Sequence, residues 1–350
     1  MTRPRIWFLT PSYHPVGGVV KVFDYVLHAL DRGHECIVTS PKPLDRDSAL
    51  FRNRRYRRLV SDEFGVEFQH TDAPAMRRGE LAFFSWPTHF RALSARAAPG
   101  VTSDAIIHLV QNVRHANPRW TDGYALRLLS RPMTRIMTNE VVLDACRPYL
   151  NQGSRTVVID LGHDTAHFAK DRKGALPERL TVGYTTWKSE VGDAIAAALA
   201  GDDRVEFRAV RGYVDWDELR DFYRSIDVFL ATPYAEEGFY MPGLEAMAAG
   251  AVVVSPDAGG NRSYMRFGDN AVFAELDNVD SYVAALRAVT TLSGNRLAAM
   301  RASAREAVGR HTLAGEARGF GALLDELVDQ SAAGADERIA VASASTSAGE

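Results

Sequence analysis

The chain has 350 residues, of which 46% are hydrophobic and 24% charged, and its net charge is −3. The length suggests about two domains of ~100–200 residues each, and the composition is that of an ordinary globular protein. A net charge so close to neutral gives no general attraction to nucleic acid or to an anionic membrane. The chain has only two cysteines, Cys36 and Cys146, which argues against a disulfide framework and against a cysteine-rich metal cluster.

The N-terminal residues do not have the pattern of a secretory signal. Arg3 and Arg5 precede a short strand-like run that turns at Pro11. No apolar stretch approaches the ~20 residues that a membrane-spanning helix needs. We therefore expect a cytoplasmic protein.

The N-terminal segment predicts a β-loop-α-β unit. Arg5–Thr10 is an apolar run typical of a buried strand, and Pro11–Gly18 is a loop. Val19–Ala29 has helical spacing, and Glu35–Ser40 predicts the next strand. Such a unit implies a right-handed crossover within a parallel sheet.

Gly17 and Gly18 lie directly before the predicted helix. Without side chains, they let backbone amides and the helix N-terminus approach an anion such as a phosphate. A plain tight turn is the alternative interpretation.

The most basic part of the chain is Leu50–Val60. Its five arginines, between Arg52 and Arg58, alternate with Phe51, Tyr56 and Leu59. The pattern predicts a basic helix that meets anionic lipid, as a peripheral contact at the inner membrane face, or a phosphorylated acceptor. A solvated helix face is the alternative.

A polar loop, Val110–Pro118, follows the predicted strand Ala105–Leu109. Because it lies at the carboxyl end of a strand, its side chains are candidates for substrate contact. His115 is the first candidate, followed by Gln111 and Asn112; a purely structural histidine is the alternative. Further strands of the first domain are predicted at Leu81–Trp86, Ile136–Thr138 and Thr156–Asp160.

The most informative stretch is Tyr234–Ser255. It follows a buried strand, Asp227–Ala231, and predicts a glycine-containing loop, a short helix over Leu244–Ala249 that Gly250 ends, and a strand. The loop therefore lies at the carboxyl edge of a parallel sheet, where α/β proteins bind ligands. Glu237 and Glu245, eight positions apart, bracket this loop, so both carboxylates are expected to face one cleft.

This stretch resembles the signature of the retaining nucleotide-sugar glycosyltransferases of family four, also called glycosyl transferases group 1. Glu237-Gly238-Phe239-Tyr240 takes the place of the family's Glu-Gly-Phe-Gly, and Leu244–Gly250 takes the place of Leu-Glu-Ala-Met-Ala-x-Gly. The N-terminal Gly-Gly and the Arg32-Gly33-His34-Glu35 segment are also similar to the family. Ile159–Phe168 resembles the segment that joins the family's two domains.

The resemblance implies a GT-B fold, in which two Rossmann-like, doubly wound parallel-sheet domains face each other across a cleft. We expect an N-terminal acceptor domain over residues 1–168 and a C-terminal nucleotide-sugar donor domain over residues 169–311. Residues 312–330 are expected to form a helix that crosses back to the first domain. Residues 331–350, rich in Ala, Ser and Gly, predict a disordered tail.

The resemblance also assigns roles to individual residues. Glu245 is expected to bind the ribose hydroxyls and Glu237 the donor sugar, with catalytic roles for Glu237, His115 and Lys188. The full set expected to bind the donor is Gly17, Gly18, Lys188, Glu237, Gly238, Phe239, Tyr240, Met241, Leu244 and Glu245.

Two departures from the family concern the diphosphate. In the family, an arginine usually precedes the position of Lys188. This chain has no matching arginine, and Thr185 and Thr186 lie in the segment that leads to Lys188. Ser263 stands where the family has a glutamate after a second Gly-Gly pair, Gly259-Gly260, which is expected to bring a second helix N-terminus to the phosphates. Arg211 or Arg262 is therefore expected to share the phosphate charge with Lys188 and helix N-termini.

The predicted reaction transfers a sugar from a nucleotide diphosphate sugar to an acceptor hydroxyl, with retention and by front-face substitution. Metal-independent chemistry without a cofactor is typical of this fold and is therefore expected. The acceptor is a glycan, a lipid-linked sugar or a small molecule. A GT-B nucleotide-sugar epimerase and a non-catalytic nucleotide-sugar binding protein are the alternatives.

Overall fold

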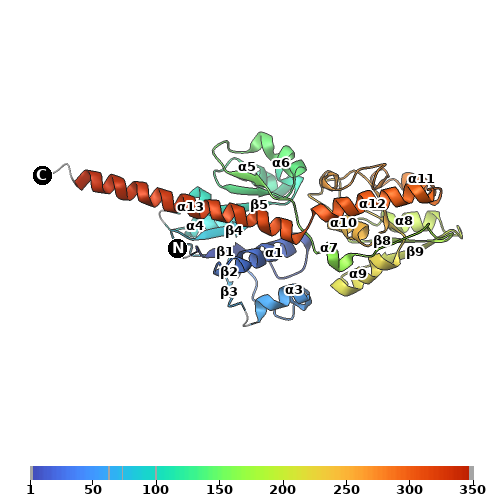
Figure 1. Cartoon of the computed structure of the whole chain (residues 1–350), viewed down its shortest axis with the longest axis horizontal. Coiled ribbons are helices and arrows are strands. Elements are labelled where there is room, and N and C mark those ends of the chain that lie inside the picture. The colour runs from blue at the N-terminus through green and yellow to red at the C-terminus, as the bar shows by residue number, and fades with distance from the viewer. Residues whose placement is uncertain (1–2, 62–63, 73, 99–100, 347–350) are drawn as a thin grey trace.

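The computed structural model describes residues 3–61, 64–72, 74–98 and 101–346, with side chains through Asp329. It contains two α/β domains that lie side by side (Figure 1). The strands of both sheets are parallel throughout the described residues. Parallel strands need helical crossovers that cover both faces of the sheet, which explains why most strand residues are apolar.

The first domain is built on a sheet with the strand order β3-β2-β1-β4-β5-β6-β7. Its strands are β1 (Ile6–Leu9), β2 (Cys36–Ser40), β3 (Glu67–His70), β4 (Leu81–Phe84), β5 (Ile106–Val110), β6 (Thr134–Met137) and β7 (Thr156–Val158). Its helices are α1 (Gly17–Asp31), α2 (Ala49–Arg52), α3 (Arg54–Arg57), α4 (His89–Arg96), α5 (Tyr124–Leu129) and α6 (Glu140–Cys146).

The second domain is built on a sheet with the order β12-β11-β10-β8-β9. Its strands are β8 (Leu180–Thr185), β9 (Val205–Val210), β10 (Val228–Leu230), β11 (Val252–Ser255) and β12 (Val272–Phe273). Its helices are α8 (Val191–Ala198), α9 (Trp216–Ser225), α10 (Met241–Ala248), α11 (Val279–Thr290) and α12 (Gly294–Arg310), and the short α7 (Thr165–Phe168) lies in the segment between the domains.

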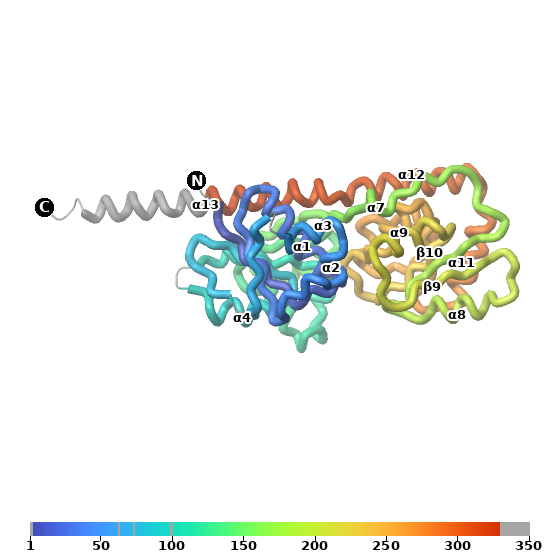
Figure 2. Tube along the Cα trace, turned by 90° about the horizontal axis from the view of Figure 1, so that it is seen from below, coloured from blue at the N-terminus to red at the C-terminus, as the bar shows by residue number. Residues whose placement is uncertain are grey.

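The last helix, α13 (Leu313–Thr346), follows α12 and runs back along the first domain (Figure 1, Figure 2). Phe320, Leu323 and Leu324 are buried in the same core cluster as residues of α1. The chain therefore passes between the domains twice. The tail predicted for residues 331–350 lies outside the residues whose side chains are described, and its disorder stays a prediction.

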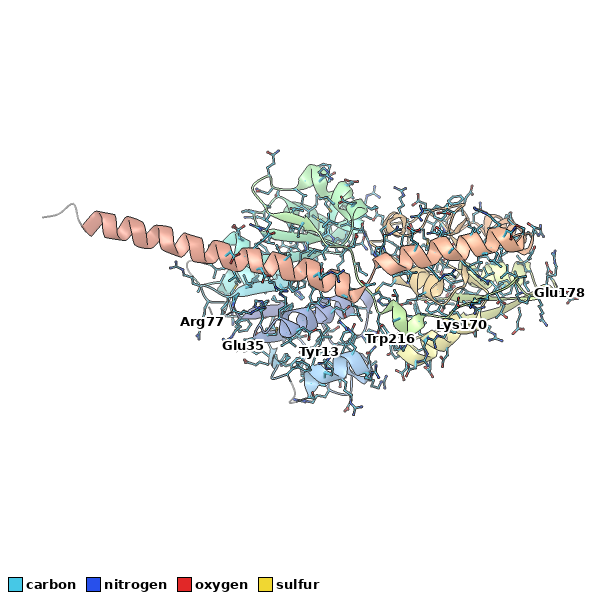
Figure 3. The ribbon with its side chains drawn as sticks, in the orientation of Figure 1. Tyr13, Glu35, Arg77, Lys170, Glu178 and Trp216 are labelled. Atoms are coloured by element: carbon cyan, nitrogen blue, oxygen red, sulfur yellow. The ribbon has the colours of Figure 1, made fainter. Side chains whose placement is uncertain are left out.

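Trp216, at the start of α9, lies where the two domains meet (Figure 3). Its partly buried ring packs against core clusters of both domains. Asp215 begins this helix with a capping box in which Glu218 binds the Asp215 backbone amide. The cap therefore fixes the helix start that brings Trp216 to the junction.

The basic segment departs from the predicted continuous helix. It forms α2 and α3, which are separated at Asn53, and then a single 3₁₀ turn. The Asn53 side chain accepts a hydrogen bond from the amide of Arg55. Because Asn competes for backbone amides in this way, it ends one helix and caps the next.

Candidate active site

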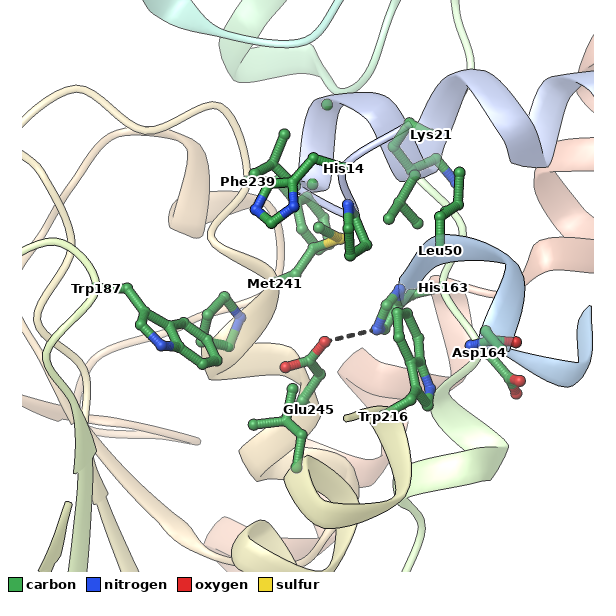
Figure 4. Close-up of a pocket in the computed structure, with 18 of the residues that line it drawn as sticks. His14, Lys21, Leu50, His163, Asp164, Trp187, Trp216, Phe239, Met241 and Glu245 are labelled. Carbon is green, nitrogen blue, oxygen red and sulfur yellow. Dashed lines mark hydrogen bonds and ion pairs between the residues drawn. The ribbon is translucent and has the colours of Figure 1, made fainter. Parts of the chain in front are cut away.

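A cleft of about 1520 Å³ lies between the domains (Figure 4). Its walls come from the loop before α1, the basic segment, the loop after β5, the hinge between the domains, and the loops after β8, β9 and β10. These β-loops follow the carboxyl ends of parallel strands, as expected for an α/β ligand site.

Glu237 and Lys188 form an ion pair in this cleft. The Lys188 ammonium donates to the Glu237 carboxylate at 2.5 Å, and the Tyr234 amide donates to the same oxygen at 3.0 Å. Glu237 is only 3% exposed. Burial lowers the pKa of Lys188, Glu237 opposes that change, and the charge of Arg114 adds to it.

Glu245 also lines the cleft, in the second turn of α10, because the helix starts at Met241 rather than at Leu244. Its carboxylate is held by the His163 ring at 2.8 Å, as the dashed line in Figure 4 shows. His163 lies on the hinge between the domains and stacks on Phe168. Sequence reasoning did not single out His163, because its partner is 82 positions away.

The backbone of Gly238, in the second domain, lies directly against residues of the first domain. A Cβ on Gly238 would lie 1.7 Å from the Gln111 carbonyl oxygen, and the Asn139 side chain donates to the Gly238 carbonyl at 2.8 Å. Gly260 packs on the other side, where its amide donates to the Glu237 carbonyl at 2.9 Å. Only a residue without a side chain fits at position 238.

The second Gly-Gly pair does not bring a helix to the cleft, as the sequence had suggested. Gly260–Ser263 is a single 3₁₀ turn, and neither Gly259 nor Gly260 lines the cleft. The two glycines instead allow the backbone of this turn to pair with the backbone of Glu237.

The other residues of the set predicted from the sequence take different places in the structure. Phe239, Tyr240 and Met241 line the cleft, whereas Leu244 is fully buried in the core of the second domain. Gly17 begins α1 across the cleft, and a Cβ there would lie 2.5 Å from the end of the Met241 side chain. Gly18 also lines the cleft, and its carbonyl accepts from Gln111 at 3.1 Å.

A match to a protein-family model falls in the second domain, which carries Glu237 and Glu245. Residues 179–291 match the family model described as Glycosyl transferases group 1. A comparison with curated protein sequences found no match.

Solved structures share the two-domain architecture. HepE of Anabaena, in complex with UDP and glucose, is 16% identical with a TM-score of 0.67, and the alignment covers 93% of this chain and 100% of HepE. Sucrose-phosphate synthase from Thermosynechococcus elongatus is 14% identical with a TM-score of 0.67, covering 94% and 100% of the two chains. A glycosyltransferase from Rickettsia africae is 11% identical with a TM-score of 0.65, covering 94% and 99%. The predicted GT-B fold is confirmed.

His115 lies at the wall of the GT-B cleft but is buried, with 2% exposure. One ring nitrogen contacts the Asn112 carbonyl at 2.9 Å, and the ring packs edge-on against Trp120. Burial lowers the pKa of His115 to about 4. At neutral pH it is therefore an uncharged hydrogen-bonding group and not a cation.

The basic segment contributes four arginines to the first-domain side of the GT-B cleft: Arg52, Arg54, Arg55 and Arg58. Arg55 binds Asp24 at 3.0 Å, and Arg52 reaches Asp215 of the second domain at 3.4 Å. The segment therefore faces the cleft and one of its arginines bridges the domains.

Arg211 and Arg262, expected to share the phosphate charge, do not line the cleft. Arg211 makes two hydrogen bonds to Asp193, and Arg262 makes a comparable pair of contacts with Asp257. Each guanidinium is thus used in a local ion pair, and the prediction for these two residues is wrong.

Two further findings concern the described residues as a whole. They contain no cluster of three or more His, Cys, Asp or Glu side chains arranged to hold a metal ion. Among their helices, none combines the length and the apolar character needed to cross a bilayer.

Proposed function

We propose that the protein is a glycosyltransferase that moves a sugar from a nucleotide diphosphate sugar to an acceptor hydroxyl. The observation that carries this proposal is the pair of buried carboxylates on one wall of the cleft, with Glu237 in the loop before α10 and Glu245 in the second turn of that helix. Both lie within the residues that match the Glycosyl transferases group 1 model. HepE, which has the same fold, forms a complex with UDP and glucose, and this supports a nucleotide-sugar donor.

Glu245 is proposed to bind the ribose of the donor. A carboxylate has two oxygens and accepts from two neighbouring hydroxyls. In the structure one of these oxygens is bonded to His163. His163 thereby holds the carboxylate in a single orientation in the cleft wall.

Glu237 is proposed to bind hydroxyls of the transferred sugar, together with backbone amides from Gly238 to Met241. Lys188 and the N-terminus of α10 would stabilise the negative charge that develops on the departing diphosphate. Since these groups supply the charge stabilisation, the proposed chemistry is metal-independent. Activity that persists unchanged in excess EDTA would support this part of the proposal.

The finer assignment follows from the motif. We propose a family-four enzyme that transfers a hexose with retention, by front-face substitution in which the leaving phosphate takes the proton of the acceptor. His115, uncharged at neutral pH, is proposed to bind a sugar hydroxyl and not to act as a cation. The basic segment Arg52–Arg58 is proposed to lie beside the acceptor.

The test begins with a thermal-shift panel of UDP-, GDP- and dTDP-sugars, because a ligand that binds the native state alone raises the melting temperature. Binding of the donor that stabilises the wild type is then measured for Glu245→Ala. Loss of two hydrogen bonds to a charged acceptor is expected to weaken donor binding by about 100-fold or more.

The matched control is Glu306→Ala, which removes an exposed glutamate on α12. It should bind the donor as the wild type does. The proposal fails if no nucleotide sugar stabilises the wild type, or if correctly folded Glu245→Ala binds and transfers at the wild-type rate.

A further inference from the structure

The cleft needs more positive charge for a diphosphate than Lys188 alone supplies. Its ammonium is already paired with Glu237 at 2.5 Å. The arginine that the resemblance leads one to expect before Lys188 is absent, and Arg211 and Arg262 are engaged elsewhere. Several negative charges brought into a partly buried site are stable only with cations or donors beside them.

Arg114 is placed to supply this charge from the opposite domain. It lies in the 3₁₀ turn Val113–Ala116 that follows β5, and it lines the cleft. Its guanidinium carbon is 5.7 Å from the centre of the Tyr234 ring, and the Lys188 ammonium is 5.5 Å from the centre of the same ring. Two cations from two domains therefore converge on one aromatic side chain.

Arg114 differs from the other cations of the cleft in its partners. Lys21, Arg52, Arg55 and Arg220 each form an ion pair with a carboxylate. Within the described residues, Arg114 forms none, and its side chain makes one hydrogen bond, from Nε to Asn112 at 3.3 Å. Arg54 and Arg58 also have no carboxylate partner there, but both are exposed and neither shares a contact with Lys188.

A half-buried guanidinium without a carboxylate is available to a ligand. Arginine has five N–H donors in a planar fork, which fits the paired oxygens of a phosphate. The two terminal nitrogens of Arg114 have no protein acceptor among the described residues, so the fork is free to bind an anion in the cleft. The positive charges of Arg114 and Lys188 repel each other when no anion is bound between them. A bound anion relieves that repulsion.

We propose that Arg114 binds the diphosphate of the donor together with Lys188, so that each domain contributes one cation to the clamp. This inference rests on the proposed function. It implies that the donor draws the domains together, because its diphosphate bridges residues of both.

The experiment measures binding of a nucleoside diphosphate and of the matching nucleoside by calorimetry, with the base chosen from UDP, GDP and dTDP by the thermal-shift panel. Arg114→Gln is compared with Arg119→Gln, an exposed arginine nearby that does not line the cleft. Arg114→Gln is expected to weaken diphosphate binding by about 10- to 100-fold and to leave nucleoside binding within about twofold. Arg119→Gln should change neither.

Arg114→Lys separates a phosphate contact from a structural role. It keeps the charge but not the fork, so diphosphate affinity should fall between those of the wild type and Arg114→Gln. The inference is overturned if Arg114→Gln binds the diphosphate as tightly as the wild type, or loses nucleoside and diphosphate binding equally. A wild-type protein that binds none of the three diphosphates would instead refute the proposed function, and the inference with it.

Discussion

Tyr240 shows at the level of one residue how this chain departs from the motif that it resembles. It stands where the motif has a glycine, and its backbone lies in the left-handed region, with φ 66° and ψ 67°. Such a conformation costs a non-glycine residue about 1–3 kcal/mol. The surroundings hold it, because the Thr232 amide donates to the Tyr240 hydroxyl at 3.0 Å and the Tyr264 hydroxyl donates to the Tyr240 carbonyl at 2.6 Å.

We predict that Tyr240→Phe destabilises the protein by about 1–3 kcal/mol, because it leaves the buried Thr232 amide without an acceptor. The measurement is the free energy of unfolding in urea. Tyr149→Phe, at a tyrosine that is 42% exposed, is the control and should stay within about 0.5 kcal/mol of the wild type. Equal stability of Tyr240→Phe and the control would show that the hydroxyl does not hold this backbone.

At the level of elements, α13 is joined to α1 and the hinge by buried charges as well as by apolar packing. The Lys21 ammonium donates to Asp24 at 2.9 Å, to Glu316 of α13 at 2.7 Å and to the Gly162 carbonyl at 2.7 Å. Lys21 is fully buried, and Glu316 also accepts from the Gly162 amide at 3.0 Å. All three ammonium protons are used, which is what makes a buried lysine tolerable.

Lys21 also sets the ionisation of Asp24. Burial alone would raise the pKa of Asp24, but the charges of Lys21 and Arg55 outweigh it, and the net pKa lies below the ordinary value of 3.8. The unfolded chain then binds more protons than the folded one between these two values, so stability rises with pH there. The stabilisation is complete above about pH 4 and is lost as the pH falls through the folded-state pKa.

Lys21→Met is expected to destabilise the protein by roughly 3–5 kcal/mol at pH 7, because it removes the cation that two buried carboxylates share and leaves Asp24 with Arg55 alone. The difference from the wild type should narrow as the pH falls toward 3.5, because without the Lys21 charge burial favours the protonated form of Asp24, which loses less from the missing cation. The free energy of unfolding in urea, measured for both proteins at pH 7 and at pH 3.5, gives this difference. Lys173→Met, at a lysine whose side chain is 87% exposed, is the control, and a pH-independent difference would contradict the account.

At the level of the whole molecule, the cleft depends on how closely the two domains approach. A Cβ on Gly238 of the second domain would overlap the Gln111 carbonyl of the first, so the two backbones approach each other closely at this point. Neither side can rotate away as a side chain would. The relative placement of Glu237 and the first-domain loop is therefore set by this contact.

We predict that Gly238→Ala folds but holds the domains apart and loses about 100-fold or more in transfer rate, because displacement by about an ångström is enough to disrupt reacting groups. Small-angle scattering should show a larger radius of gyration. Gly309→Ala, on α12 with open space around its Cα, is the control. Unchanged activity and scattering for Gly238→Ala would contradict the prediction.

The strands and their order of appearance were predictable where burial is complete. β1, β2, β4 and β5 are apolar or buried throughout, so their sequences stand out from the helices. β3 was not predicted, because its residues are exposed or half-buried at the edge of the sheet. The start of α10 was placed three residues late, since Met241-Pro-Gly243 has a composition typical of a loop.

The sequence by itself determined two parallel α/β domains and the loop that carries Glu237 and Glu245, because buried strands, glycine-ended turns and a local motif leave their mark on neighbouring residues. Only the tertiary structure decided that His163 holds Glu245, that Arg114 and Lys188 converge on Tyr234, and that Lys21 binds Glu316. Lys21 and Glu316 are 295 positions apart. Such pairs depend on how distant segments of the chain pack against one another, and that packing leaves no periodic pattern in the sequence.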